Sequence, residues 1–594
     1  MHPLRKIIPI FIAASIAWIW MFIIIGEDYG QLANEIPGEP NDDGFNAIYL
    51  HHMVHDALRN GRFDLSDPNQ LYPIGFPQAS TNGGNSLEMI ASGLLRFFYA
   101  WPKWFGLSHY IWIPLNTLSF VVLGRYLWQN WYGSIAAGLT WSILPFTIEF
   151  MRFGRLTQTV QFGLPIATLG FLLLVEKGGR RAVWALGLGM IMCAWSYWFF
   201  AIFMVVLSPI FLIYGSNKRD SHRIQKEIQT GAFLFFVGIT PLLLMVYAPV
   251  LQGKDMPKAP VSTAAISPLF PDALRLFGEG ATLISDVVPI TLIACLLVGF
   301  WKAKRRILWL SLTFVSFFFA MGPALKAQGM IWIFPYYYLW KGVPTLNRLL
   351  HPERWLLVGG LFLVVLSMDG LVRWSKRNHA LKILVLCLPL CLLYELNTKE
   401  TLPLKTWKFN VPEVWKILAA EEEGGIISVP VMNSQLNSRY QPFHGKPLLG
   451  GMVENQPWNY PKPYMEFVQG NGLLMALFAL SKDAPKPFEV YAEDLEELRE
   501  KGFRYIVYDK ASWDRLSYHK VMWNQIQRNQ SRHIRYLKDA LGEPAYTTTD
   551  GDFIWYLPSG GKKGRGPAAG GSIRSIGPHD DIPEDELPFH PKEY

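Results

Sequence analysis

The sequence is dominated by long apolar runs that contain almost no charged residues. Examples are Ile7–Ile25, Gly231–Leu251, Leu356–Leu371 and Leu381–Leu396. A helix that crosses a bilayer needs about 20 mostly apolar residues, and these runs approach that length. Only 17% of the chain is charged and 51% is hydrophobic, whereas a soluble domain usually carries about 25% charged residues. A soluble enzyme, a disordered scaffold and a disulfide-stapled secreted module are excluded. The chain is predicted to be an α-helical polytopic membrane protein.

The basic residues predict the topology of these runs. Dense basic groups such as Lys218, Arg219 and Arg223 fill the short loops that lie in the cytoplasm if the N-terminus does, as the positive-inside rule requires. The net charge of +8 is explained in this way, and no nucleic-acid partner is expected. A break near Ser196–Trp198 is predicted to divide residues 182–214 into two short helices. Eleven crossings are predicted, at residues 7–25, 108–128, 132–150, 157–175, 182–197, 200–214, 231–250, 287–301, 306–323, 355–372 and 380–396.

The spacing of these runs predicts three parts of the chain. Residues 1–397 form the transmembrane domain, which includes a first outer loop at 26–107 with amphipathic helices. Residues 398–558 form an outer, periplasmic or extracellular, α/β domain, because short β-rich runs such as Phe503–Tyr508 alternate with helical patterns there. Residues 559–594 are Gly-rich and basic and then acidic, a composition typical of a disordered tail.

Two adjacent carboxylates follow the first predicted crossing. Asp42 and Asp43 lie in Asn41–Gly44, just before a predicted helix at 45–58. One interpretation is a helix N-cap, because aspartate at a helix start accepts backbone hydrogen bonds. A cap needs only one carboxylate, and two like charges this close are unfavourable unless they share a cation or a proton donor. We therefore favour a functional role for the pair.

Two groups of basic residues are predicted on the outer side, where the positive-inside rule does not place them. Arg152 and Arg155 lie at the outer end of the third crossing. They either extend to lipid phosphates at the interface or hold a bound phosphate, since arginine stays charged and binds phosphate through two parallel hydrogen bonds. The sequence leaves both readings open.

The second group precedes the tenth crossing. Arg348, His351 and Arg354 have the spacing of one helical face, and Tyr337 lies in the aromatic loop before them. This position suits an anionic headgroup or a diphosphate. The alternative is membrane anchoring by the aromatic residues together with a salt bridge to Glu353.

Three short motifs, together with the topology, resemble the GT-C superfamily of polytopic membrane glycosyltransferases in its bacterial branch. The motifs are Asp42-Asp43-Gly44, the turn Tyr72-Pro73-Ile74-Gly75, and the outer segment in which Pro344, Arg348, Pro352 and Arg354 recur. The resemblance covers about residues 1–400 and extends loosely to the outer domain. One departure is Arg155, which stands where many relatives have histidine.

The resemblance implies an integral glycosyltransferase of the inner (cytoplasmic) membrane. It implies a sugar donor linked to polyprenyl phosphate and an envelope acceptor (glycan, lipid or protein) on the non-cytoplasmic side. Asp43, with Asp42 as second choice, is expected to act as general base on the acceptor or to help hold Mg²⁺ or Mn²⁺. The outer arginines are expected to neutralise the leaving lipid phosphate. The competing class is a non-enzymatic scaffold or a transporter for envelope polymer or lipid assembly on the same fold.

Overall fold

The structure is a computed structural model of the chain, which divides into two compact units. Unit 1 comprises Met1–Gly44, Gly83–Leu244 and Val261–Phe409, and unit 2 comprises Phe45–Asn82, Met245–Pro260 and Asn410–Tyr594. The predicted first outer loop is thus shared between the units. The structure describes residues 4–26, 35–38, 42–62, 67–76, 87–99, 103–216, 219–251, 288–327, 330–343, 346, 349, 352–399, 402–429, 431, 434–451, 461–480, 486–510 and 520–564.

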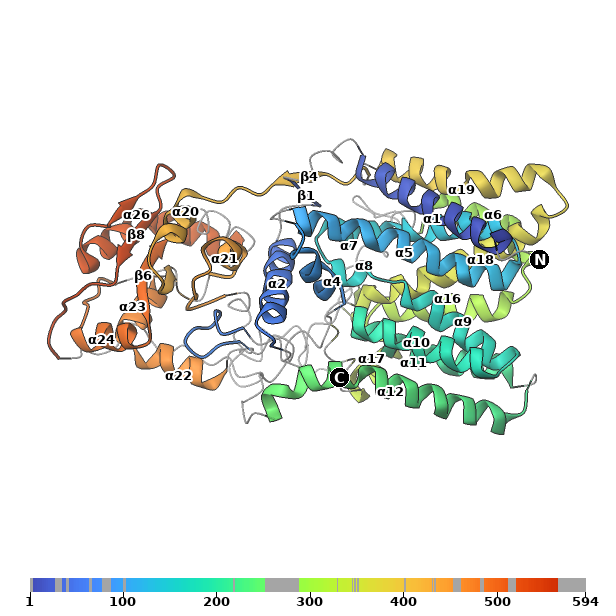
Figure 1. Cartoon of the computed structure of the whole chain (residues 1–594), viewed down its shortest axis with the longest axis horizontal. Helices are drawn as coiled ribbons and strands as arrows, with labels where there is room; N and C mark the ends of the chain where they lie inside the picture. Colours follow the sequence, from blue (N-terminus) through green and yellow to red (C-terminus); the bar gives the residue numbers. More distant parts are fainter. Residues whose placement is uncertain are drawn as a thin grey trace. The chain divides into compact units, whose positions relative to one another are not determined.

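Unit 1 is built mainly of helices (Figure 1), most of which are apolar. Within the described residues, seven helical segments are long and apolar enough to cross a membrane, or eight if the bent pair α6–α7 is one span. The helices are α1 (Leu4–Ile25), α4 (Leu87–Leu95), α5 (Lys103–Trp128), α6 (Trp131–Ser142), α7 (Pro145–Arg152), α8 (Leu156–Thr159), α9 (Gly163–Glu176), α10 (Arg180–Ser196), α11 (Trp198–Gly215), α12 (Ser221–Leu251, whose last turns fall in unit 2), α15 (Ile290–Gly299), α16 (Arg306–Ala320), α17 (Tyr336–Gly342), α18 (Trp355–Ser375) and α19 (His379–Thr398).

All eleven predicted crossings contain helix, but three of them do not meet the length and composition of a span. These are α10, α15 and α16, with 17, 10 and 15 residues. A helix rises 1.5 Å per residue, so a ten-residue helix covers about half of a ~30 Å hydrocarbon core. The prediction counted apolar runs, whereas helix length decides whether a run can cross alone. The predicted break is confirmed, because α10 ends at Ser196 and α11 begins at Trp198.

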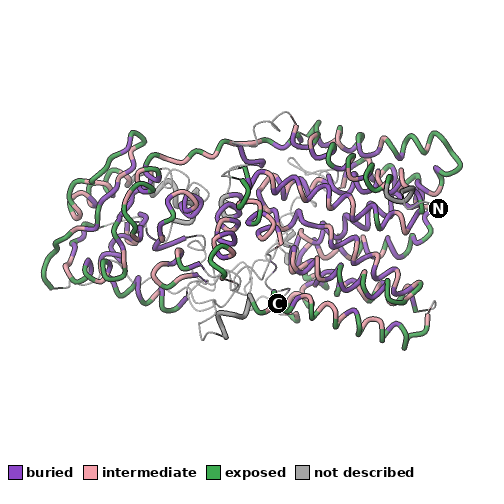
Figure 2. Tube along the Cα trace, in the orientation of Figure 1, coloured by how far each residue is buried: buried purple, intermediate pink, exposed green. Residues whose placement is uncertain are grey.

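Helix α18 forms the centre of unit 1. An 18-residue stretch of it is wholly buried, and it packs against α15, α16, α19 and α6. Figure 2 shows buried residues along the inner helices of unit 1. Near the C-terminus of α18, the Asp369 carboxylate accepts hydrogen bonds from the Trp128 indole at 2.8 Å, the Lys304 backbone amide at 2.7 Å and the Arg373 guanidinium at 2.7 Å. This buried charge is compensated by its donors, so it fastens three parts of the bundle together.

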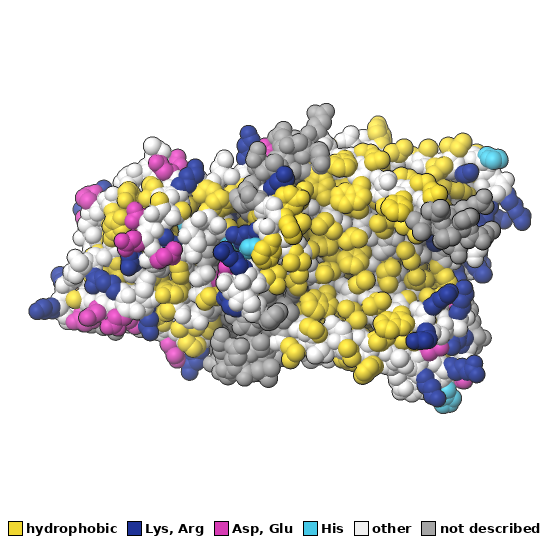
Figure 3. Space-filling view, in the orientation of Figure 1, with side chains coloured by type: hydrophobic (Ala, Val, Ile, Leu, Met, Phe, Trp, Pro, Cys, Tyr) yellow, Lys and Arg dark blue, Asp and Glu magenta, His cyan; other side chains and the backbone are white. Residues whose placement is uncertain are grey.

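A second carboxylate, which is mostly but not fully buried, has the same structural role. Glu176, at the end of α9, receives both arms of the Arg305 guanidinium, at 2.7 and 2.8 Å, and the Tyr126 hydroxyl at 2.8 Å. Lysines and arginines gather on the surface at this end of unit 1 (Figure 3). We call it the basic end, and define it by Lys177, Arg181, Lys304 and Arg377.

Unit 2 contains a four-stranded sheet in the order β5-β6-β8-β7. β5 (Gly425–Val429) and β6 (Phe503–Tyr508) are parallel, while β8 (Phe553–Tyr556) and β7 (Tyr546–Thr547) are antiparallel to their neighbours. Its helices are α20 (Glu413–Ala420), α21 (Gln441–His444), α22 (Lys462–Gly470), α23 (Gly472–Ala479), α24 (Ala492–Glu500), α26 (Lys520–Leu541) and most of α2 (Asp42–Arg59). In the predicted tail, Lys562 forms an isolated parallel β-bridge with Tyr491. Residues 565–594 lie outside the described residues.

Three short strand and turn elements complete unit 1. β1 (Glu35–Pro37) pairs antiparallel with β4 (Thr406–Lys408), and β2 (Ala324–Ala327) with β3 (Met330–Ile333). The 3₁₀ turn η5 (Pro352–Arg354) leads directly into α18.

Candidate functional site

A broken helix carries the first two candidate arginines. α6 and α7 are bent by 45°, with Pro145 at the start of α7. After α7 the chain reverses at Gly154, whose φ of +71° is a backbone conformation that glycine adopts without steric penalty. The Arg155 amide then donates to the Phe150 carbonyl at 2.9 Å, which closes the turn. Non-helical backbone at membrane depth is tolerated where it is buried in protein or lines a cavity.

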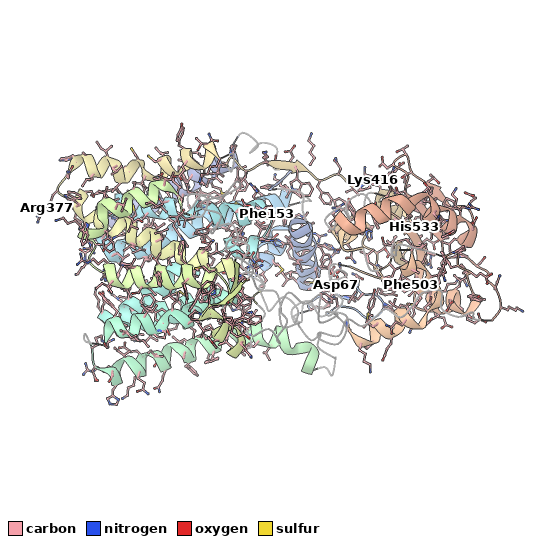
Figure 4. The ribbon with its side chains drawn as sticks, turned by 180° about the vertical axis from the view of Figure 1, so that it is seen from behind. Asp67, Phe153, Arg377, Lys416, Phe503 and His533 are labelled. Atoms are coloured by element: carbon pink, nitrogen blue, oxygen red, sulfur yellow. The ribbon has the colours of Figure 1, made fainter. Side chains whose placement is uncertain are left out.

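The two arginines of this turn lie against one aromatic ring. The guanidinium carbons of Arg152 and Arg155 are 5.0 and 5.9 Å from the centre of the Phe153 ring. Arg152 also pairs with Glu149 at 3.1 Å, in a half-exposed contact that contributes little in solvent. Arg152 and Arg155 therefore both lie beside Phe153, which Figure 4 shows at the end of the helices opposite Arg377.

Arg354, a third candidate arginine, contacts the side chain of Tyr197. It precedes α18, and its guanidinium donates a hydrogen bond to the Tyr197 hydroxyl and lies 5.4 Å from the centre of that ring. Tyr197 occupies the break between α10 and α11, is 1% exposed, and also hydrogen-bonds Gln158. The backbone amide of Gln158 in turn donates to the backbone carbonyl of Arg155 at 3.1 Å. Since Tyr197 is uncharged, its contact does not neutralise Arg354.

A buried polar network stabilises the second helix break, between α8 and α9. The Asn116 side chain donates to the Thr159 carbonyl at 2.7 Å and accepts from the Gln161 amide at 3.0 Å. The Gln161 side chain donates to Thr147 at 3.1 Å and to the Gln158 carbonyl at 3.0 Å. These bonds satisfy backbone groups that the break removes from the helical ladder. The segment with Gln158 is thereby held in one place.

The chain that leads to Asp42 and Asp43 passes the same turn. A Cβ atom at Gly38 would lie 2.6 Å from the Arg152 carbonyl oxygen, and Gly38 has a φ of +103°. The close approach therefore requires glycine. Asp42 follows only four residues later, so its Cα lies within about 15 Å of that of Gly38, because consecutive Cα atoms are 3.8 Å apart. The two aspartates and the Arg152 turn are thus tied to one region of unit 1.

The other predicted site residues are placed as follows. Asp42 and Asp43 form the first residues of α2, but their side chains are outside the described part, and Arg348 and His351 lie outside the described residues. Tyr337 is half-buried on α17 and contacts the Tyr338 and Trp340 rings and Lys341. Its neighbour Tyr336 is buried, and its ring lies 6.2 Å from that of Trp355, the residue after Arg354.

Two residues of this site, Tyr197 and Gln158, were not predicted. The signal for Gln158 is a polar run, Thr157 to Thr159, inside a segment predicted to cross the membrane. Tyr197 lies at the predicted helix break, but nothing in the sequence pairs it with Arg354. Among the described residues, no group of three or more His, Cys, Asp or Glu side chains could hold a metal ion.

Comparisons with known proteins give similarity only to solved structures. No protein-family model matches the chain, and no curated protein matches it. The arabinofuranosyltransferase AftD from Mycobacteria is similar over 84% of this chain and 36% of its own, with 14% identity and a TM-score of 0.48. The Archaeoglobus fulgidus oligosaccharyltransferase is similar over 85% of this chain and 70% of its own, with 11% identity and a TM-score of 0.44. The chain thus spans about a third of the mycobacterial protein.

Proposed function

We propose that the chain is a membrane glycosyltransferase that transfers a sugar from a polyprenyl-phosphate-linked donor to a cell-envelope acceptor on the non-cytoplasmic side. The observation that carries the proposal is the contact between Gly38 and the Arg152 carbonyl. It ties the start of α2, with its two aspartates, to the turn that holds Arg152 and Arg155. A general base and a cationic phosphate site are the two groups that this transfer needs.

In the proposed reaction, a carboxylate removes the proton of an acceptor hydroxyl as its oxygen attacks the anomeric carbon of the donor. The bond from that carbon to the lipid-phosphate oxygen breaks, and the phosphate leaves with the electron pair. Asp43 is the proposed base, and Asp42 is the second choice. Arg155 and Arg354 are proposed to stabilise the negative charge of the leaving phosphate, and Arg152, Arg348, His351 and Tyr337 are the further residues proposed to bind the donor.

A divalent cation is a separate part of the proposal. Mg²⁺ or Mn²⁺ at Asp42 and Asp43 would add positive charge near the lipid phosphate. Activity of the EDTA-treated protein, with and without each metal added back, tests this point. Unchanged activity after metal removal would leave the two carboxylates without a metal role.

The test of the function is transfer by the purified full-length protein from a panel of radiolabelled polyprenyl-phosphate sugars. Asp43→Asn is expected to lower turnover by about 10²- to 10⁴-fold, the usual contribution of a general base. Asp539→Asn is the matched control, because Asp539 is exposed on α26 in unit 2. Wild-type turnover in both Asp43→Asn and Asp42→Asn would remove the catalytic assignment.

The hydrogen bonds of two carboxylates in unit 1 do not favour the transporter alternative. Buried charges in transport proteins usually mark an ion or substrate path. Asp369 and Glu176, however, are hydrogen-bonded by groups of several helices at the basic end, as structural anchors are. Failure of every lipid-phosphate sugar to bind would favour the scaffold alternative.

A further inference from the structure

The helix that begins with Asp42 and Asp43 is attached to unit 2 through the loop that follows it. α2 is continuous from Asp42 to Arg59, and all but its first turn is counted with unit 2. The Tyr49 hydroxyl, in the middle of the helix, donates to the buried Asp67 carboxylate. Backbone hydrogen bonds of 2.8 Å in both directions between Asp67 and Phe76 close the loop at that point. A shift of this loop would therefore be transmitted to α2.

The loop segment Asn69–Tyr72 pairs with the chain beside the sheet of unit 2. The Leu71 amide donates to the Gly450 carbonyl at 3.0 Å, and the Tyr72 amide donates to the Leu448 carbonyl at 3.0 Å. In return, the Leu448 amide donates to the Asn69 carbonyl at 2.8 Å. Leu448 is itself bridged to Ile426 of β5. The loop is thus joined by backbone hydrogen bonds to the segment Leu448–Gly450, which is itself bridged to β5.

The side chains of Gln70 and Tyr72 pack against positions of unit 2 where glycine leaves space for them. The Tyr72 ring lies 5.1 Å from that of Phe503 in an edge-to-face arrangement. A Cβ atom at Gly425 would be 3.2 Å from the Tyr72 ring, and a Cβ atom at Gly502 would be 2.7 Å from the Tyr72 hydroxyl. The buried Gln70 side chain donates to Gln441 at 3.3 Å, and a Cβ atom at Gly451 would lie 2.4 Å from it. Three glycines make room for two side chains.

The segment also holds a backbone conformation that it would not keep by itself. Leu71 is fully buried and has a φ of +49°, which is uncommon for a residue other than glycine. Such conformations persist when the surrounding contacts impose them. Here the contacts are the backbone bonds to Leu448 and Gly450. Figure 4 labels the two ends of this chain of contacts, Asp67 and Phe503.

We propose that unit 2 positions the candidate catalytic carboxylates, and that Gln70 and Tyr72 are the positioning residues through which it does so. The inference rests on the proposed function for the role of Asp42 and Asp43. In this proposal the contacts of Gln70 and Tyr72 hold the loop and α2, and the continuous helix carries Asp42 and Asp43 in its first turn. Loss of the contacts is therefore expected to reduce the rate of the chemical step and to leave donor binding nearly unchanged.

The test combines hydrogen–deuterium exchange of α2 with transfer kinetics of the full-length protein. Tyr72→Ala and, independently, Gln70→Leu are expected to speed exchange of the α2 amides while those of β6 stay protected, which shows that unit 2 remains folded. Both variants are expected to lower kcat by about ten- to a hundredfold, the range that small misplacements of a catalytic group produce. KM for the lipid donor is expected to stay within about twofold, because the donor site is not altered.

Tyr546→Ala is the matched control, since Tyr546 is a partly exposed tyrosine of unit 2 on the edge strand β7. It is expected to change neither α2 exchange nor kcat. Unchanged α2 exchange in Tyr72→Ala and Gln70→Leu would overturn the proposal, and so would faster exchange with wild-type kcat. Wild-type turnover in both Asp43→Asn and Asp42→Asn would instead refute the catalytic assignment, while the exchange data still decide whether unit 2 holds α2.

Discussion

At the scale of single residues, Tyr197 connects the groups of the candidate phosphate site. Its hydroxyl accepts a hydrogen bond from Arg354 and hydrogen-bonds the Gln158 side chain. The backbone amide of Gln158 in turn donates to the backbone carbonyl of Arg155. An arginine side chain is long and loses much conformational freedom when it is held. A tyrosine fixed between two helices therefore restricts the Arg354 guanidinium, which would pre-orient it for the proposed phosphate.

Replacement of this hydroxyl gives the first prediction. Tyr197→Phe keeps the ring under Arg354 and removes its hydrogen bond, so the affinity for polyprenyl monophosphate is expected to fall about tenfold, the value of a hydrogen bond to a charged group. A fluorescence titration in lipid nanodiscs measures it. Tyr338→Phe, which alters an exposed tyrosine, is the control. Equal affinity of wild type and Tyr197→Phe would mean that the hydroxyl does not orient Arg354.

A buried acid in unit 2 gives a prediction about pH. Asp552 is 1% exposed, and burial together with the neighbouring Asp509 raises the pKa of Asp552 to about 6. This pKa is higher in the folded than in the unfolded chain, so protonation of Asp552 adds to the free energy of unfolding. The added stability is fully present below about pH 4 and is lost as the pH rises through about 6.

The thermal stability of unit 2 is therefore expected to decrease across this interval, and the Asp552→Asn variant to lack most of that decrease. Melting followed by the fluorescence of the chain between pH 4 and pH 7 checks it. Asp539→Asn, at an exposed position of α26, serves as the control. The same slope in Asp552→Asn and wild type would assign the pH dependence to another group.

At the scale of secondary structure, the ion pair of Arg305 and Glu176 fastens the start of α16 to the end of α9. Its two bonds are short and the side chains are 8% and 15% exposed. Removal of one partner leaves a buried charge, which typically costs about 3–5 kcal/mol. Arg305→Met is thus expected to lower the melting temperature of unit 1 clearly, while Arg377→Met, at an exposed position of the same end, leaves it unchanged. Similar melting of the two variants would show that the pair does not stabilise the bundle.

Helix and strand positions were largely accessible from sequence, because they depend on local patterns. The break at Tyr197 followed from a run too long for one crossing, and β6 has the predicted bounds Phe503–Tyr508. The second helix break, at α8, was not predicted, because its polar residues were counted within an apolar window. Its stabilising partners, Asn116 and Thr147, lie on other helices, and such pairing is invisible in one sequence.

At the scale of the whole molecule, the grouping of the first outer loop was beyond sequence reasoning. The prediction kept residues 26–107 with the transmembrane domain, whereas Phe45–Asn82 packs with the chain after Asn410. The contacts responsible join residues about 370 positions apart, such as Gln70 and Gln441. The arginines of the site were identified from their side of the predicted topology, but their link through Tyr197 required the fold.

The predicted sidedness is tested by cysteine labelling. Arg535→Cys in unit 2 and Arg377→Cys at the basic end are introduced separately into a chain without its four native cysteines. A membrane-impermeant maleimide is expected to label Arg535→Cys in intact cells and Arg377→Cys only after the membrane is opened. The reverse pattern would invert the topology and place the candidate site in the cytoplasm.

We propose above that arginines at the end of unit 1 opposite the basic end bind a lipid phosphate. The most direct measurement is the dissociation constant of polyprenyl monophosphate in nanodiscs for wild type, for Arg155→Met with Arg354→Met, and for Arg377→Met as the matched loss of a cation. We expect at least about a hundredfold weaker binding in the double variant, because two charged hydrogen bonds are lost, and wild-type binding in Arg377→Met. Equal binding by all three proteins would show that these arginines do not hold the lipid phosphate.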